Sequence, residues 1–357
     1  MTQTQSTASA AAPPAKLTRL RLDQLSVSLT TEAGMIPVVQ SLSLSIAAGE
    51  TLALVGESGS GKSVTSLAVM GLLDRHAQPE VQGQAWFTRG NGETVDLLSL
   101  DRARRRQLCG NELAMIFQEP MTSLNPVLSI GEQIAESLCT HRGIDHRAAL
   151  ARALEMLEMV EVPAAKQRLH HYPHQLSGGL RQRVMIAMAM VCNPSLLIAD
   201  EPTTALDATV QAQILALMGR LQRETGMAIL FVTHNLGVVA HYADRVAVIY
   251  AGRIVESAGV EEFFDAPLHP YSRGLLACLP GVARLKSHGE SRPRLTTIPG
   301  LAARAGDSVQ GCSFAPRCSH RQSDCEASTP VLTLVDAPAT KTARSLSCFH
   351  SPGKVGL

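Results

Sequence analysis

The sequence is poor in aromatic residues, with seven Phe, four Tyr and one Trp among 357 residues. It still contains 45% apolar and 18% charged residues, which excludes a disordered or collagen-like chain. An excess of one charge is missing too, because 32 Lys and Arg oppose 31 Asp and Glu and leave a net charge of +1. We therefore expect no nucleic-acid partner, and the basic run Arg102–Arg106 is expected to be a solvated helix face.

Long apolar runs are missing as well. The best candidate, Val184–Ala199, is interrupted at residues 193–195 by Asn, Pro and Ser, so no stretch reaches the roughly 18 residues of a membrane-spanning helix. Residues 1–16 lack the basic and apolar regions of a secretory signal. Their Ala, Pro, Ser and Thr content predicts a disordered tail, and the cytosol is the compartment expected by default.

The eight cysteines include no tight Cys-x2-Cys pair of the kind found in most zinc ribbons. Four are scattered and are expected to be small apolar side chains: Cys109, Cys139, Cys192 and Cys278. The other four stand in the last 50 residues with the spacing Cys-x5-Cys-x6-Cys-x22-Cys: Cys312, Cys318, Cys325 and Cys348. Because no export signal is expected, this cluster suggests a metal site more than disulfides.

Apolar strand-like runs alternate with amphipathic helical stretches between residues 17 and 262, which predicts an α/β fold. The expected strands are Thr51–Val55, Leu196–Ala199, Ile229–Val232 and Val246–Tyr250. The expected helices are Ser63–Leu73, Gly131–His141, Arg147–Val160, Gln182–Val191 and Val210–Thr225. No internal repeat is present, so one module is expected. Near Phe264 the composition changes to Pro, Gly, Arg and Cys, and residues 263–357 are predicted to form a smaller extension.

A glycine-rich segment follows the first expected strand: Gly56, Glu57, Ser58, Gly59, Ser60, Gly61, Lys62 and Ser63. It fits the P-loop pattern Gly-x4-Gly-Lys-Ser/Thr, with a buried strand before it and a helix after it. Glycines let successive N–H groups close around a phosphate, and the helix N-terminus adds partial positive charge. Lys62 is expected to reach the β- and γ-phosphates of a nucleotide, and Ser63 to ligate Mg²⁺.

The strand Leu196–Ala199 leads into two adjacent acids, Asp200 and Glu201. Two carboxylates beside a buried strand need a functional reason, since an unpaired buried charge is costly. Downstream of a P-loop, Asp200 is expected to hold Mg²⁺ through water. Glu201 is then expected to polarise the water that attacks the γ-phosphate.

The sequence Leu176–Leu180 (LSGGL), followed by Arg-Gln-Arg, stands at the start of another expected helix. Ser177 suits the N-cap, and Gly178 and Gly179 leave backbone amides bare, so this helix start is expected to be a second phosphate-binding surface. The segment closely resembles the signature motif of ABC ATPases.

Three further elements resemble the same family and stand in its order over residues 56–234. Gln118 resembles the Q-loop glutamine, residues 205–207 (Ala-Leu-Asp) resemble the D-loop, and His234 resembles the switch histidine. The resemblance implies a P-loop NTPase fold with a RecA-like core, an N-terminal antiparallel β part and a helical subdomain at about residues 119–180. One departure concerns adenine, which the family stacks on an aromatic residue; Leu29, or Val38 and Val39, would have to serve here.

The resemblance also implies a mechanism shared between two chains, in which MgATP is sandwiched between the P-loop of one and the signature motif of the other. ATP would favour the closed dimer and hydrolysis would release it. The residues implied to act on the nucleotide of the opposite chain are Ser177, Gly178, Gly179 and Asp207. The implied catalytic residues are Gln118, which is also a Mg²⁺ ligand, Glu201 as the base, and His234 at the γ-phosphate.

Residues 118–127, 172–190 and 199–215 closely resemble the ATP-binding subunits of dipeptide and oligopeptide importers, with glutathione importers a near relative. That likeness implies two transmembrane permeases, a second ATPase subunit, an extracytoplasmic substrate-binding protein acting indirectly, and a peripheral position on the cytoplasmic face of a bacterial inner membrane. Importers of nickel or another small solute remain alternatives. A non-transport ABC ATPase and a redox or iron sensor are alternatives from other classes.

The C-terminal sequences HPYSRGLL from His269, IPG from Ile298 and GCSFAPRC from Gly311 look like the tail of the same importers. Some members of that family carry a [4Fe–4S] cluster, and the four C-terminal cysteines are interpreted as its ligands. Free thiols and structural zinc remain alternatives. The expected role of such a cluster is to stabilise a tail too small to bury its own core.

Overall fold

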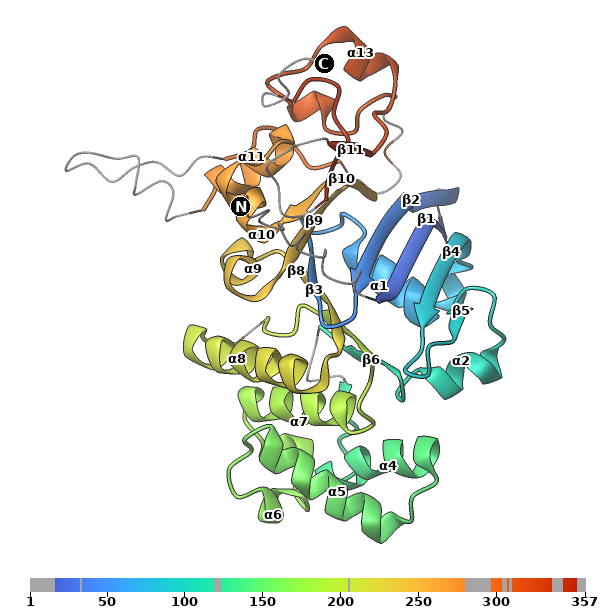
Figure 1. The fold of residues 1–357 in the computed structure, drawn as a ribbon, viewed down its shortest axis with the longest axis vertical. Helices are drawn as coiled ribbons and strands as arrows, with labels where there is room; N and C mark the ends of the chain where they lie inside the picture. Colours follow the sequence, from blue (N-terminus) through green and yellow to red (C-terminus); the bar gives the residue numbers. More distant parts are fainter. Residues whose placement is uncertain are drawn as a thin grey trace, which may run out of the picture.

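The computed structural model describes residues 17–32, 34–118, 123–204, 206–279, 297–303, 307, 310–335 and 343–351. The predicted tail at residues 1–16 and Ala205 of the expected D-loop lie outside these ranges. Three regions follow one another along the long axis (Figure 1): a group of helices at one end, two β-sheets in the middle, and the C-terminal extension at the other end. Within the described ranges, no helix combines the length and the apolar character needed to cross a bilayer.

The central sheet has eight strands in the order β11-β12-β10-β9-β3-β8-β7-β6. Their bounds are β3 (Thr51–Val55), β6 (Leu113–Ile116), β7 (Leu196–Asp200), β8 (Ala228–Thr233), β9 (Arg245–Tyr250), β10 (Arg253–Gly259), β11 (Thr333–Val335) and β12 (Arg344–Leu346). The strands from β9 to β6 run parallel, and every residue of β3, β7 and β8 is buried, because both faces of a parallel sheet are covered. All four strands expected from their continuous apolar runs are confirmed.

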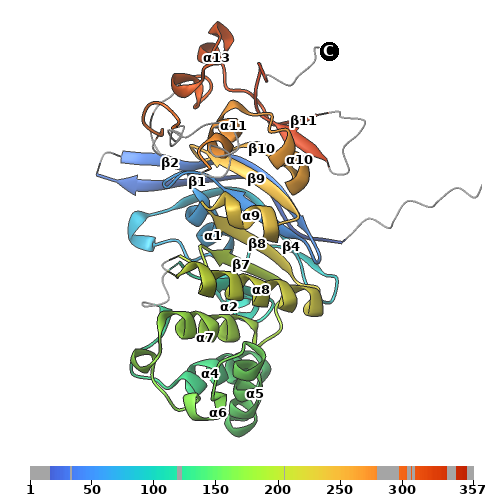
Figure 2. The same cartoon turned by 90° about the vertical axis from the view of Figure 1, so that its left-hand side faces the viewer.

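A second, antiparallel sheet has the order β2-β1-β4-β5, with β1 (Thr18–Thr31), β2 (Gly34–Ala47), β4 (Glu80–Thr88) and β5 (Thr94–Asp96). Figure 2 shows the long β1–β2 hairpin beside the central sheet. Leu20, Leu22 and Phe87 of this sheet share one buried apolar cluster with Leu52 and Leu54 of β3. The antiparallel β part implied by the family resemblance is therefore present.

The helices expected from periodicity are present, with shifted ends. Among the described residues, the helices before the extension are α1 (Lys62–Met70), α2 (Arg102–Leu108), α4 (Ile130–Arg142), α5 (His146–Met159), α6 (Ala165–Arg168), α7 (Gly178–Met190), α8 (Ala208–Thr225) and α9 (Leu236–Tyr242), with short 3-10 turns at Arg75–Ala77 and Pro173–Gln175. Helix α1 ends before the predicted Leu73 because Gly71, at φ 68°, forms a left-handed C-cap. Helix α7 begins at Gly178, so the two signature glycines are inside it. In α2, Arg105 is half-buried and donates to the Leu97 carbonyl, so the expected solvated face is wrong for that residue.

Helices α4 to α7 form the helical region at one end of the molecule (Figures 1 and 2). Its core contains Ile134 of α4, Ala153 and Met156 of α5, and Val184 and Ile186 of α7. The same apolar cluster continues into β6, β7 and β8. The helical region and the parallel sheet are therefore packed as one body through α7.

The extension continues the central sheet. Strand β12 pairs antiparallel with β10, and β11 pairs with β12. Glu256 of β10 is fully buried and pairs with Arg344 of β12 at 2.7 Å, while also accepting the Leu268 and His269 N–H groups at 2.8 Å each. The other described elements from residue 260 onward are α10 (Val260–Asp265), α11 (Pro270–Ala277), a 3-10 turn at Ala315–Arg317, and α13 (Ser323–Ala327).

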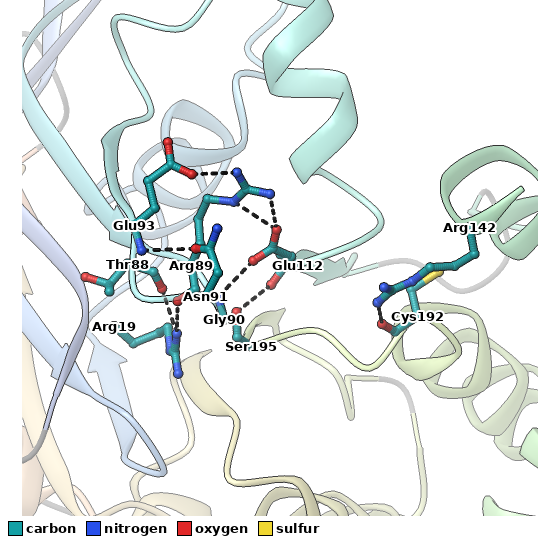
Figure 3. A network of polar contacts seen from close by, with 10 residues as sticks. All are labelled: Arg19, Thr88, Arg89, Gly90, Asn91, Glu93, Glu112, Arg142, Cys192 and Ser195. Atoms are coloured by element: carbon teal, nitrogen blue, oxygen red, sulfur yellow. Dashed lines mark hydrogen bonds and ion pairs between the residues drawn. The ribbon is translucent and has the colours of Figure 1, made fainter.

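Glu112 joins the antiparallel sheet to the parallel one (Figure 3). Its carboxylate accepts hydrogen bonds from Arg89 at 2.7 and 2.9 Å and from the Gly90 N–H at 2.9 Å, while its carbonyl accepts the Ser195 N–H at the start of β7. Burial alone would raise the pKa of Glu112, but these hydrogen bonds outweigh it and lower that pKa below its ordinary value.

We predict that Glu112→Gln lowers the free energy of unfolding by roughly 1–2 kcal/mol at pH 7, because it removes a charge-assisted hydrogen-bond pair. A lowered folded pKa contributes stability above the unfolded pKa of about 4.3 and loses it as pH falls through the folded value. The difference between wild type and variant should therefore shrink on acidification, measured by urea unfolding. Glu93→Gln is the matched control, since Glu93 pairs with the same Arg89 but is half exposed.

Candidate active site

The turn between β3 and α1 has the backbone shape that its glycines predict. Gly59 and Gly61 have φ values of 78° and 103°, a region that favours glycine. A Cβ atom on Gly61 would lie 2.9 Å from the Val38 carbonyl oxygen, and one on Gly56 would lie 2.3 Å from the Ile249 carbonyl oxygen. The loop is thus packed tightly between the β1–β2 hairpin and β9, and side chains at these two glycines would displace it.

Lys62 lies against this loop. Its ammonium donates hydrogen bonds to the carbonyl oxygens of Gly56 and Glu57, both at 2.9 Å. Burial lowers the pKa of Lys62, while the nearby Glu201 and Asp200 carboxylates act in the opposite direction. A positive charge is therefore held where the carboxylates and a bound phosphate would both attract it.

Asp200 ends β7 and is only 4% exposed. It accepts a hydrogen bond from Ser63, and burial raises its pKa. Its Oδ1 atom and the hydroxyl of Ser60 are buried without a hydrogen-bond partner, and such atoms are rare unless a ligand uses them. A carboxylate and a hydroxyl are the hard oxygen donors that Mg²⁺ prefers, so the residues predicted to hold it suit that ion.

The three predicted catalytic residues meet at one carboxylate. Glu201 accepts a hydrogen bond from the Gln118 amide at 3.2 Å and lies 2.9 Å from Nδ1 of His234. The Thr204 hydroxyl also donates to Glu201, at 2.9 Å. These residues come from the end of β7, the segment after β6 and the turn after β8, so the parallel strand order brings their carboxyl ends together.

Glu201 itself is held in an uncommon conformation. Its φ is 46°, in the left-handed region that non-glycine residues seldom adopt outside functional sites. Burial would raise the pKa of Glu201, but the hydrogen bonds from His234 and Thr204 outweigh it and lower that pKa. An ionised carboxylate at neutral pH can accept a proton from water, as a general base must.

The signature residues occupy a separate place in the chain. Ser177 stands at the N-cap of α7, but its hydroxyl makes no capping hydrogen bond, which leaves the first amides of the helix uncapped by it. Asp207 caps α8 and accepts the Thr209 and Val210 N–H groups at 3.0 and 2.9 Å. Among the described residues, no hydrogen bond or ion pair joins Ser177–Gly179 to the loop at 56–63.

Sequence reasoning missed three residues that contact the site. Thr204 follows the two acids closely and could have been found as a hydroxyl one turn away. Tyr271 and Arg317 come from the extension and contact Glu57 of the loop. Their motifs could be read as a family tail, but no local pattern indicates a contact across more than 200 residues.

The four C-terminal cysteines surround one small cavity of about 10 Å³, which Phe314 and His350 also line. Burial raises the pKa of Cys348 to about 11, and the three other thiols reinforce the shift, so the four sulfurs lie within electrostatic range of each other. Beside the cavity, Asp324 and His350 pair at 2.7 Å and lie with Cys325 within ligand distance of a single ion. The four thiols, together with Asp324 and His350, are donors that suit a thiolate-bound metal or cluster.

Comparison with known proteins agrees with this geometry. Residues 39–204 match the family model described as ABC transporter, and residues 255–325 match the one described as oligopeptide/dipeptide transporter, C-terminal region. The chain is 53% identical over 309 residues to a Brucella melitensis protein provisionally named as a peptide import ATP-binding protein, covering 86% of this chain and 90% of that one. The chain belongs to the ABC transporter ATP-binding proteins.

Other members of the family extend the comparison. The glutathione import ATP-binding protein GsiA of Pectobacterium atrosepticum is 55% identical over 262 residues, which are 73% of this chain and 42% of that protein. Among solved structures, the ATP-binding cassette MJ0796, a dimer in a post-hydrolysis state with ADP and Pi, has a TM-score of 0.59 at 30% identity and covers 68% of this chain and 98% of its own. A Clostridium perfringens cbiO1 structure, at 24% identity and a TM-score of 0.57, shows the same fold.

This ABC ATPase therefore has the parts for ATP hydrolysis in one place. The loop amides and Lys62 would bind and neutralise phosphates, and Ser63 with Asp200 would hold Mg²⁺, which would supply charge stabilisation when bound. Glu201, held by its contacts with His234 and Gln118, is placed to serve as the predicted base for the attacking water.

We predict that Glu201→Gln lowers ATP hydrolysis at least 100-fold while ATP still binds, because the amide has nearly the same size as the carboxylate but cannot accept a proton from water. The measurement is phosphate release together with equilibrium nucleotide binding. Glu224→Gln, an exposed position on α8, is the control. Hydrolysis near the wild-type rate would rule out the assigned role of Glu201.

A second prediction concerns pH. Removing the Thr204 hydroxyl by Thr204→Val takes away a bond that lowers the pKa of Glu201, so that pKa should rise. The acidic limb of the kcat–pH profile should then move to higher pH, with the alkaline side unchanged. Thr225→Val removes a hydroxyl that bonds to the Leu221 carbonyl and the Met227 N–H at the C-terminal end of α8, and it should leave the profile as it is.

Proposed function

We propose that this ABC ATPase powers the import of dipeptides and oligopeptides through two membrane permeases, from the cytoplasmic face of a bacterial inner membrane. The observation that carries this proposal is a combination within one chain. The hydrolytic site around Glu201 is joined to a C-terminal region that matches the oligopeptide/dipeptide transporter model over residues 255–325. The relatives named for peptide import match nearly the whole chain.

The working unit is proposed to be a dimer of ATPase subunits, formed with an identical or a related chain. Ser177 and Asp207 lie at helix starts that form no hydrogen bond or ion pair with the loop at 56–63 within the described chain, which suits residues that act on a nucleotide held by the other subunit. The dimeric MJ0796 cassette supports such an arrangement. Because two surfaces would share the γ-phosphate, ATP stabilises the closed pair and its cleavage removes that stabilisation.

Gln118 is proposed to carry the signal between the permeases and the chemistry. It stands where the chain leaves β6 for the helical region, and its amide contacts the catalytic carboxylate of Glu201. A permease segment seated on the helical region would move Gln118 relative to Glu201 as the dimer closes. Hydrolysis would then follow the state of the permeases.

Glutathione is the second candidate substrate, because GsiA is 55% identical over the segment it shares with this chain. Uptake by a deletion strain offered labelled dipeptides, longer peptides and glutathione distinguishes the two. We expect peptide uptake to be lost and to be restored by the wild-type gene but not by Glu201→Gln. Unchanged peptide uptake with loss of glutathione uptake would favour the second candidate, and no loss of either would contradict import.

We further propose that Cys312, Cys318, Cys325 and Cys348 hold a [4Fe–4S] cluster. Four thiolates satisfy the ligand requirement of such a cluster, and all four line one cavity. When bound, the cluster would cross-link four segments of the extension and so stabilise it.

Anaerobic purification should therefore yield a brown protein with iron and sulfide near four per chain. Cys348→Ser should lose most of that iron, since it removes one of the four ligands. Cys278→Ser, a cysteine outside the cavity, is the control and should keep the iron. A colourless protein with one zinc per chain would replace the cluster by a zinc site, and a metal-free protein would end both ideas.

A further inference from the structure

Two side chains of the extension hold one residue of the phosphate-binding loop. Arg317 donates to both carboxylate oxygens of Glu57, at 2.7 and 3.1 Å. The Tyr271 hydroxyl accepts the N–H of the same residue at 3.0 Å. Glu57 is the second residue of the loop, so the extension fixes both its side chain and its peptide group.

Arg317 is built into this position. Its side chain is only 5% exposed, its Nε donates to the Pro299 carbonyl at 3.0 Å, and its guanidinium lies over the rings of Tyr250 and Phe314. A buried, bidentate arginine of this kind has one conformation available and neutralises its partner strongly. The contact is therefore unlike the exposed ion pairs that contribute little.

An acidic residue in a phosphate-binding loop opposes phosphate binding, because its negative charge repels the phosphates. The Glu57 charge is close enough to act on Lys62, the residue that reaches the phosphates. Without a counter-charge, the Glu57 carboxylate would repel the phosphates of ATP bound at this loop, and partial burial would strengthen that repulsion. Arg317 supplies that counter-charge from the opposite end of the chain.

The same segment also faces the cysteine cavity. Arg317 ends the turn Ala315–Arg317, directly before Cys318. Phe314 lines the cavity, and its ring centroid lies 5.3 Å from that of Tyr250, edge-on, and 5.4 Å from that of Tyr271, tilted. One packed unit thus joins the four cysteines to Glu57. We propose that the extension is a working part of the nucleotide site, in which Arg317 is a positioning residue that neutralises Glu57 and links nucleotide affinity to the integrity of the cysteine cluster.

The first test measures binding of the non-hydrolysable analogue AMP-PNP, with Mg²⁺, to the full-length chain. Arg317→Met should weaken binding about 10-fold or more, and the double variant Glu57→Gln/Arg317→Met should recover most of that loss. The loss should be smaller for ADP, which carries less phosphate charge. Arg321→Met is the matched control, because Arg321 forms an exposed pair with Glu326 in the same extension.

Two results would overturn the inference: wild-type affinity in Arg317→Met, or a double variant that binds as weakly as Arg317→Met. Should Arg317→Met fail to fold, Tyr271→Phe serves instead. It keeps the packed ring but removes the acceptor of the Glu57 N–H, and it should weaken AMP-PNP binding several-fold. Unchanged binding in that variant would count against the inference.

The link between the cysteine cluster and nucleotide affinity rests on the proposed four-cysteine site and is tested by a separate experiment. Cys318→Ser should weaken AMP-PNP binding when residue 57 is Glu, and should have no effect in the Glu57→Gln background. Iron content of the same variants tests the cluster separately. If Cys318→Ser loses its iron but binds AMP-PNP as tightly as the wild type, the link to the nucleotide site is refuted, while the assignment of a cluster to the four cysteines stands. Neither result depends on whether peptides are transported.

Discussion

The site depends on two adjacent carboxylates at the end of a buried sheet, whose negative charges have to be balanced by neighbouring groups. Asp200 and Glu201 leave β7 where its neighbours also end, so Lys62, Ser63 and His234 reach them from adjacent strands and turns. The low dielectric makes each of these interactions strong and makes an unmatched charge costly. The same surroundings shift the two pKa values in opposite directions, upward for Asp200 and downward for Glu201. The negative charge of Asp200 is therefore costly until a cation balances it, whereas Glu201 stays ionised through its hydrogen bonds.

Much of the core could be read from the sequence because its strands are apolar along their whole length. Strands β3 and β7 were predicted almost to the residue, since burial on both faces removes any polar position that could blur the pattern. Strands β1 and β2 could not be found this way. Their pairing contains several register shifts, with Gln24 and Ser41 at positive φ, so the regular alternation of an antiparallel strand is broken.

The residues of the candidate site also differ in how far they could be predicted from the sequence. Residues carried by short motifs, such as Lys62 and Glu201, were identified because the motif and its chemistry stand in one place. Gln118 and His234 needed the family resemblance, since a lone Gln or His after a strand has many other uses. The contact between Arg317 and Glu57 was out of reach, because it joins positions 260 residues apart through side-chain packing that no local pattern records.

The pairing of β12 with β10 has a consequence for how the chain folds. Strand β10 is a strand of the central sheet, yet one of its edges is covered only by residues close to the C-terminus. Until β12 pairs with it, that edge is open and the buried carboxylate of Glu256 lacks its ion pair with Arg344. Exposed strand edges invite association with other chains. The ATPase core and the extension are thus joined through one strand edge, and a chain in which β12 has not yet paired is open to aggregation there.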